Sequence, residues 1–175
     1  PVYASEGEWK SITGDYSEVQ MEWDVTNGVL INDDLKVKAF KTHHDAYEPL
    51  GYTVTDQENT RCSICLDTGK VDEDMLAAMK HSNIYIIEAN HEPNMVEVSD
   101  YPISVKARIL SHIGHLSNEQ TAETLSKLVK GNGERIYLTH LSNKNNLPAL
   151  AEMTVKRALT KKALKSGTHY HIEVV

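Results

Sequence analysis

The chain has 175 residues, of which 40% are hydrophobic and 25% charged, and its formal net charge is −7. This composition predicts one globular domain, and the acidic balance argues against a surface that coats nucleic acid generally, while leaving room for a local basic patch. No stretch reaches the roughly 20 consecutive apolar residues of a membrane span, so the sequence predicts no membrane partner.

The first part of the chain gives short and mixed signals. Residues 1–4 predict a strand and 6–12 a short helix, and strand-like alternation and turn residues share the range 14–34. Residues 35–41 alternate as a half-buried strand does. A second strand at 51–55 turns back into an apolar stretch that begins at Arg61, which predicts a β-hairpin.

Three apolar strands each end in a polar residue of the kind found in active sites. Arg61 to Cys65 leads to Asp67, residues 83–87 lead to Glu88, and residues 134–139 lead to His140. Helical patterns separate the strands, which favours parallel pairing with right-handed crossovers. Because parallel strands place their carboxyl ends on one edge, these three side chains are expected to gather along one rim of the sheet. A single acid after a strand would be ordinary turn chemistry.

The helices are marked by capping residues and apolar stripes. A helix is expected after Asp72 or Asp74, and two short ones over residues 91–97 and 104–111. Ser117 fits the start of a capping box, and the helix that it begins is expected to end at Gly131. The last helix is expected to begin at Asn146, with Pro148 in its first turn, before a final strand over 168–175.

Cys62 and Cys65 are the only cysteines of the chain. Their position within a strand favours reduced thiols that fill core space. A Cys-x-x-Cys redox pair is the alternative, but that motif belongs at the start of a helix. Reduced thiols in turn suggest a cytoplasmic protein.

Four histidines stand at the ends of predicted segments: His44, His91, His115 and His140. Any one of them alone would more often be a surface residue or a residue with satisfied hydrogen bonds. Together with Asp67 they supply imidazole nitrogen and carboxylate oxygen, the donors that suit a hard or borderline divalent metal.

Several motifs resemble those of the metallo-β-lactamase fold, and in particular its YycJ/WalJ branch, which is similar to bacterial DNA exonucleases. The motifs are Thr42-His43-His44-Asp45-Ala46, Leu66-Asp67-Thr68-Gly69, Glu88-Ala89-Asn90-His91, Gly114-His115-Leu116-Ser117-Asn118 and Leu138-Thr139-His140-Leu141-Ser142. The resemblance covers essentially the whole chain. It implies an α/β architecture, the αββα sandwich of that fold.

The resemblance also implies roles for single residues. His44 would be a ligand of a first metal, His140 a ligand of a second, and Asp67 the carboxylate that bridges them. Glu88 and His115 look like the acid–histidine pair that moves a proton in related tRNA 3′-processing endonucleases. Two divalent metals, zinc or manganese, and a DNA substrate would follow for the intact protein.

The chain departs from this family in one respect, because it contains no His-x-His-x-Asp-His motif. It is therefore expected to be a single, truncated domain that covers residues 1–175, is inactive alone and holds metal partially or not at all. The missing strands would leave a sheet edge and an apolar sheet face exposed to water, which predicts a homo-oligomer that covers them.

Two alternatives to a DNA exonuclease stay open. One is a hydrolase of another ester, such as a lactone, a thioester or a small phosphodiester, since fold does not fix substrate. The other is a non-catalytic half-domain that dimerises. The basic residues of the tail, residues 150–175, are as consistent with an ordinary solvated helix face as with binding of nucleic acid.

Overall fold

A seven-stranded mixed sheet forms the centre of the structure, a computed structural model that describes residues 2–12, 20–22, 29–31 and 34–175. In spatial order its strands are β3 (Val29–Ile31), β4 (Leu35–Lys41), β5 (Leu50–Thr55), β6 (Arg61–Cys65), β7 (Ile84–Glu88), β8 (Glu134–Thr139) and β9 (Tyr170–Val174). Two further strands, β1 (Val2–Ala4) and β2 (Gln20–Glu22), form a separate parallel pair. Much of the range 14–34, for which strand and turn signals were predicted, lies outside the described residues.

Strands β3 to β6 are antiparallel to their neighbours, whereas β6 to β9 run parallel. The predicted hairpin is confirmed: β5 pairs with β6, and the Asp56 amide donates to the Thr60 carbonyl across the turn. The predicted parallel pairing of β6, β7 and β8 is also confirmed. Their carboxyl ends therefore share one edge of the sheet.

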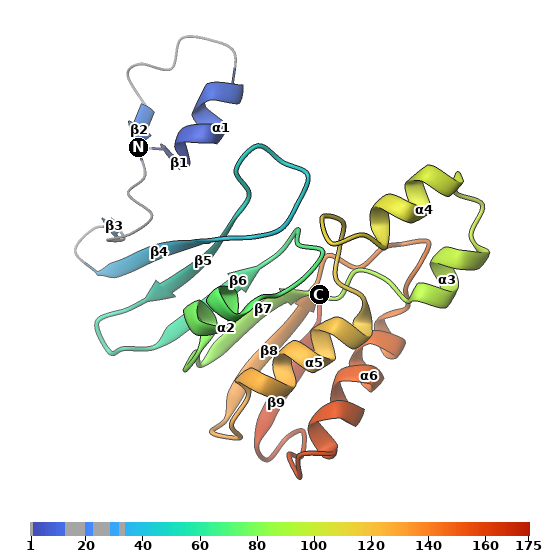
Figure 1. Ribbon diagram of the computed structural model, residues 1–175. Helices are drawn as coiled ribbons and strands as arrows, with labels where there is room; N and C mark the ends of the chain where they lie inside the picture. The colour runs from blue at the N-terminus through green and yellow to red at the C-terminus, as the bar shows by residue number, and fades with distance from the viewer. Residues whose placement is uncertain (1, 13–19, 23–28, 32–33) are drawn as a thin grey trace.

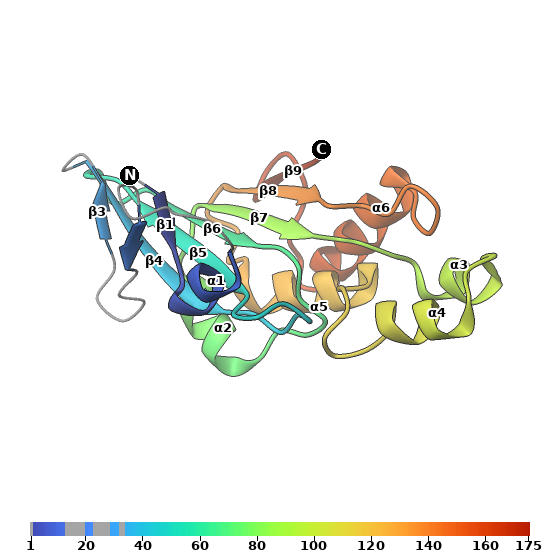
Figure 2. The same ribbon diagram turned by 90° about the horizontal axis from the view of Figure 1, so that it is seen from above.

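Three helices cover one face of this sheet, and two others project beyond its carboxyl edge (Figures 1 and 2). The covering helices are α2 (Glu73–Met79), α5 (Asn118–Leu128) and α6 (Pro148–Thr160). The projecting ones are α3 (Pro93–Val98) and α4 (Ile103–Ile109), while α1 (Glu6–Ser11) lies near the N-terminus.

The helix ends follow their capping chemistry. Asp72 caps α2 through the Met75 amide, and the capping box predicted at Ser117 is confirmed. Helix α5 ends at Leu128, before the predicted Gly131, because the Glu134 carboxylate binds the next free amides, those of residues 130–132. Helix α6 begins later than predicted, since the Asn146 side chain bonds to Asn118 and to the Ala89 carbonyl.

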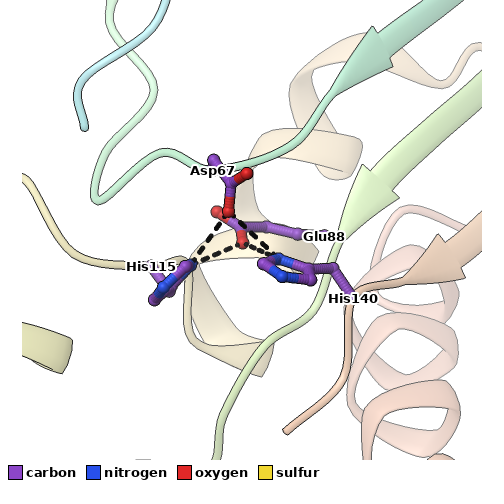
Figure 3. A group of neighbouring side chains, drawn as sticks. All are labelled: Asp67, Glu88, His115 and His140. Carbon is purple, nitrogen blue, oxygen red and sulfur yellow. Dashed lines mark hydrogen bonds and ion pairs between the residues drawn. The ribbon is translucent and has the colours of Figure 1, made fainter. Parts of the chain in front are cut away.

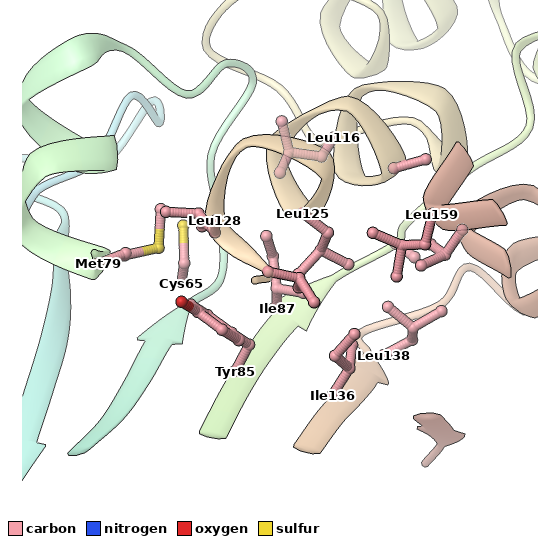
Figure 4. Packing of buried hydrophobic residues seen from close by; sticks show 14 of the residues in the cluster. Cys65, Met79, Tyr85, Ile87, Leu116, Leu125, Leu128, Ile136, Leu138 and Leu159 are labelled. Atoms are coloured by element: carbon pink, nitrogen blue, oxygen red, sulfur yellow. The ribbon is translucent and has the colours of Figure 1, made fainter. Parts of the chain in front are cut away.

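The core lies between the sheet and these helices (Figure 4). Tyr85 and Ile87 of β7 and Leu138 of β8 pack there against Leu125 of α5, and all four side chains are at most 1% exposed. Cys65 is buried in the same cluster as a free thiol, and burial raises its pKa. The interpretation of Cys65 as a core thiol is therefore confirmed, and a raised pKa makes the thiol unreactive.

The opposite face of the sheet carries an apolar row that we call the open face. Tyr52, Ile64, Ile86 and Tyr137 stand in register across β5 to β8, and each is half-buried. The helices α2, α5 and α6 all lie on the other face of the sheet (Figures 1 and 2). No described helix has the length and apolar character needed to cross a membrane.

Candidate active site

The site lies where the parallel strands end. Asp67 follows β6, Glu88 is the last residue of β7, and His140 follows β8. His115 joins them from the turn before α5. One ligand atom from each of these four side chains lies within 4.8 Å of the others (Figure 3).

Glu88 is the buried centre of this cluster, with a side chain that is fully inaccessible to solvent. Its Oε2 lies 3.1 Å from Nδ1 of His115 and 3.1 Å from Nδ1 of His140. Its Oε1 accepts hydrogen bonds from the amides of Thr68 and Leu116. Burial acts to raise the pKa of Glu88, but the hydrogen bonds from both histidines and from Thr68 outweigh it, so the pKa is lowered.

Asp67 and His140 form the exposed side of the cluster. Asp67 Oδ1 lies 3.4 Å from His140 Nδ1 and 3.6 Å from His115 Nδ1. The hydrogen bond to Glu88 raises the pKa of His140. Asn90 donates to the His140 carbonyl and so holds the turn that presents this ring.

His44 lies beside the cluster rather than within it. Its ring centroid is 5.0 Å from that of His115, and its Nδ1 lies 3.0 Å from the Gly114 carbonyl oxygen. The backbone near His44 is joined to the Asp67 turn, since the Gly69 amide donates to the His43 carbonyl. His44 and Asp67 also line a common cleft of about 320 Å³.

Two ion pairs around the site were not predicted from the sequence. His43 Nε2 lies 2.6 Å from Asp72 Oδ2, and Arg108 of α4 binds both oxygens of Asp45. The Arg108 hydrogen bond lowers the pKa of Asp45 to about 2. Asp45 Oδ1 in turn lies 3.3 Å from His44 Nε2. A carboxylate next to a candidate ligand histidine was the available signal, because such pairs orient the ring.

His91, the remaining histidine at a segment end, lies outside the cluster. It is 2% exposed, and its Nδ1 has no hydrogen-bond partner among the described residues. Burial lowers its pKa to about 4. His91 is therefore a neutral core residue rather than a ligand of the cluster.

The donors of the cluster fit a divalent metal ion. Two carboxylates and two imidazoles converge from four separate segments of the chain, and the buried Glu88 fixes the orientation of both rings. Carboxylate oxygen and imidazole nitrogen are ligands that zinc and manganese accept. A buried carboxylate behind a ligand histidine is also a common arrangement at metal centres.

Comparison with known proteins identifies relatives for most of the chain. Residues 3–141 match the family model described as β-lactamase superfamily domain. Exodeoxyribonuclease YycJ of Bacillus anthracis is 34% identical over 175 residues, which cover 98% of this chain and 66% of that protein. Exodeoxyribonuclease WalJ of Streptococcus pneumoniae is 34% identical over 139 residues, which cover 79% of this chain and 51% of that protein. The chain thus spans between about half and two thirds of the length of these relatives.

Solved structures with the same fold are more distant in sequence. Zinc-bound PqqB from Methylobacterium extorquens superposes with a TM-score of 0.59 at 14% identity, over 98% of this chain and 62% of that one. A diphosphatase of the PhnP family gives a TM-score of 0.58 at 14% identity, over 98% of this chain and 54% of that one. These likenesses agree with the fold that the sequence predicts.

Proposed function

Because this chain belongs to the β-lactamase superfamily, we propose that its protein is a divalent-metal-dependent hydrolase that cleaves phosphodiester bonds of DNA as an exonuclease. The observation that carries the proposal is the convergence of Asp67, Glu88, His115 and His140 at the carboxyl edge of the sheet. The relatives named as exodeoxyribonucleases supply the substrate class.

Asp67 and His140 are the residues proposed to hold metal, with His44 at the adjoining position. A divalent ion bound there supplies Lewis-acid activation of water and charge stabilisation at the phosphoryl group. Glu88 accepts a hydrogen bond from Nδ1 of His140 and so orients the ring that would hold the ion. The intact protein is proposed to hold two such ions.

His115 is proposed to supply the proton that the leaving oxygen needs. Its Nδ1 faces Glu88, so Nε2 is the ring atom left to carry the transferable proton. The buried carboxylate of Glu88 fixes the direction of this ring. A histidine held in this way is suited to general acid catalysis near neutral pH, because an alkoxide is a poor leaving group without a proton donor.

Two other readings of the site remain as competing hypotheses. A hydrolase of lactones or thioesters would use the same donors, since the fold hosts several chemistries. A non-catalytic half-domain would use the open face to dimerise and leave the cluster idle. The assay below separates the three.

The test uses the full gene product that contains these residues, with the 175-residue chain beside it. We expect release of nucleotides from end-labelled DNA in the presence of manganese or zinc, and loss of that release on chelation. Asp67→Ala should abolish it, whereas Asp74→Ala, on the exposed first turn of α2, should not. Turnover of a lactone or thioester but not of DNA would overturn the nuclease proposal, and no turnover of any ester would favour the non-catalytic module.

A further inference from the structure

A cleft opens directly beside the cluster, under the two projecting helices. We call residues 92–114, which contain α3 and α4, the arm. The cleft lies between the arm and the loop after β8. His115 and His140, which belong to the cluster, also line this cleft. Its volume is about 290 Å³, close to the lower limit of small-molecule sites in proteins.

The walls of the cleft combine an aromatic ring, aliphatic side chains and a cation. Tyr101 and Val105 face it from the arm, and Leu141 faces it from the loop after β8. Arg108 stands at the same wall, and the ammonium group of Lys144 lies 5.1 Å from the centroid of the Tyr101 ring. An aromatic and apolar slot next to cations is the combination that binds the bases and phosphates of single-stranded nucleic acid.

Arg108 keeps donors for a ligand although it is paired. Its Nε and one Nη donate to the two oxygens of Asp45. A guanidinium group has five N–H donors, so three remain, and the side chain of Arg108 is 54% exposed. The pair with Asp45 therefore fixes the direction of the guanidinium without exhausting it.

Hydrogen bonds hold the arm against the His44 loop and the turn of His115, and hold its two helices to each other. Arg108 joins it to the His44 loop through Asp45, and the Ile109 carbonyl accepts a hydrogen bond from the His115 amide. Lys106 Nζ donates to the Glu97 carbonyl and ties α4 to α3. A cleft whose walls are fixed before binding loses less conformational entropy when a ligand enters.

We propose that this cleft binds the nucleotide next to the scissile phosphodiester at a single-stranded end of the substrate, with its base against Tyr101 and a phosphate oxygen on Arg108. This inference rests on the proposed nuclease function. A stacked base within a duplex cannot enter a slot of this size, so the cleft selects an unpaired end. The shared lining by His115 and His140 places the bound nucleotide beside the reacting groups.

The test measures binding, so it does not depend on turnover. Fluorescence anisotropy with a fluorescein-labelled oligothymidylate is recorded for the 175-residue chain. Tyr101→Ala should raise Kd by roughly 5- to 150-fold, the range expected for loss of one stacked base, and Tyr101→Phe should keep the affinity. Arg108→Ala should raise Kd and reduce the dependence of binding on salt, because one phosphate contact is lost.

The matched control is Arg157→Ala. Arg157 is an exposed residue of α6 that lies on the helix-covered face of the sheet, which we call the helical face, and not in the cleft. It should bind the oligonucleotide as the wild type does. If Arg157→Ala weakens binding and Tyr101→Ala does not, the helical face rather than the cleft binds nucleic acid and the proposal fails. Absence of oligonucleotide binding by the wild-type chain overturns it as well.

A second assay separates this proposal from the nuclease function. The full gene product is tested on methyl p-nitrophenyl phosphate, a diester without a base. Tyr101→Ala should lower kcat/KM for the oligonucleotide by a larger factor than kcat/KM for this diester. Equal losses on both substrates would refute the subsite alone. Lack of wild-type hydrolysis of any phosphodiester would refute the nuclease function itself.

Discussion

Asp67 and His140 share an uncommon backbone geometry: φ is 51° at Asp67 and 56° at His140, and Asp67 Oδ1 lies 3.4 Å from His140 Nδ1. The left-handed region is disfavoured for residues with a side chain. Both strained residues belong to the cluster, which is where such backbone outliers tend to be found. The backbone of the site is therefore strained, and a substitution that relieves the positive φ should stabilise the fold.

His140→Gly should be more stable than His140→Ala by about 1 kcal/mol, because glycine adopts a positive φ without steric cost. The matched control is Arg135 in β8, where the order should reverse and Arg135→Gly should be less stable than Arg135→Ala. Urea unfolding of the four variants measures both differences. An alanine variant at position 140 as stable as the glycine variant would contradict the strain.

The stability of the chain should fall as the pH drops from 7 to 5 because of His91. Its pKa is about 4 when folded, against an ordinary value of 6.5, since burial disfavours the charged ring. Between these values the unfolded state binds more protons, so acid favours unfolding, by about 2 kcal/mol from pH 7 to pH 5 for this group. His91→Gln should remove that part of the slope in urea titrations. His171→Gln, at an exposed position, should keep the slope, and equal slopes in wild type and His91→Gln would exclude the effect.

Gly69→Ala should destabilise the chain by about 1–3 kcal/mol, the usual cost of overpacking. A Cβ at this position would lie 2.4 Å from the carbonyl oxygen of Ser111, so the base of the arm would have to move away from the Asp67 turn. Gly133→Ala is the control: its φ is 88°, but a Cβ there meets no atom within 4 Å. It should cost less, only the left-handed backbone penalty of about 1 kcal/mol. Chemical denaturation decides between the two, and a Gly69→Ala variant as stable as wild type would refute the close approach.

The 175-residue chain by itself should retain less than one zinc ion per molecule after dialysis. It contains no His-x-His-x-Asp-His motif, and both ring nitrogens of His44 are engaged, by the Gly114 carbonyl and by Asp45. Since Glu88 and His115 are assigned to proton transfer, Asp67 and His140 remain as protein ligands, whereas a catalytic zinc usually has three. Elemental analysis of wild type, Asp67→Ala and the control Asp74→Ala measures this. Two tightly held ions would show that the expectation of weak binding is wrong.

The open face should be covered by a second copy of the chain in solution. Ile64, Ile86 and Tyr137 form an apolar, half-buried row on this face, on the side of the sheet away from α2, α5 and α6, and an apolar sheet face exposed to water favours association. Sedimentation at micromolar concentration should give a dimer or larger species. Ile86→Lys should shift it towards monomer, while Lys162→Glu in the exposed turn after α6 should not. A wild-type monomer would argue against the homo-oligomer.

The hydrophobic pattern of the strands and helices was enough to predict which side chains meet at the rim of the sheet. Apolar strands followed by Asp67, Glu88 and His140, with helices between them, imply parallel neighbours whose ends meet. His115 follows no strand, so the sequence placed it only among the histidines at segment ends, and its role came from the resemblance of its motif. Its place depends on the turn before α5, where the Asn90 amide donates to the Leu116 carbonyl.

The electrostatic arrangement of the site was not predictable from the sequence. Glu88 faces two histidines at once, and the pair of Asp45 with Arg108 joins segments far apart in the chain. Such contacts depend on side-chain direction, which residue spacing does not determine. The positive φ values of Asp67 and His140 were also hidden, because the residue that signals this conformation is usually glycine.

The hydrogen bonds of Glu88 Oε1 make two backbone amides sensitive to the site. Thr68 and Leu116 donate to this buried carboxylate rather than to a carbonyl of the sheet or a helix. Their deuterium exchange therefore depends on the position of one side chain, whereas the amides of β7 and β8 exchange with the opening of the core. A ligand that draws Glu88 towards the rim would speed exchange at these two amides and leave the strands unchanged. The chain thus reports the occupancy of its own site in an NMR spectrum, without substrate or turnover.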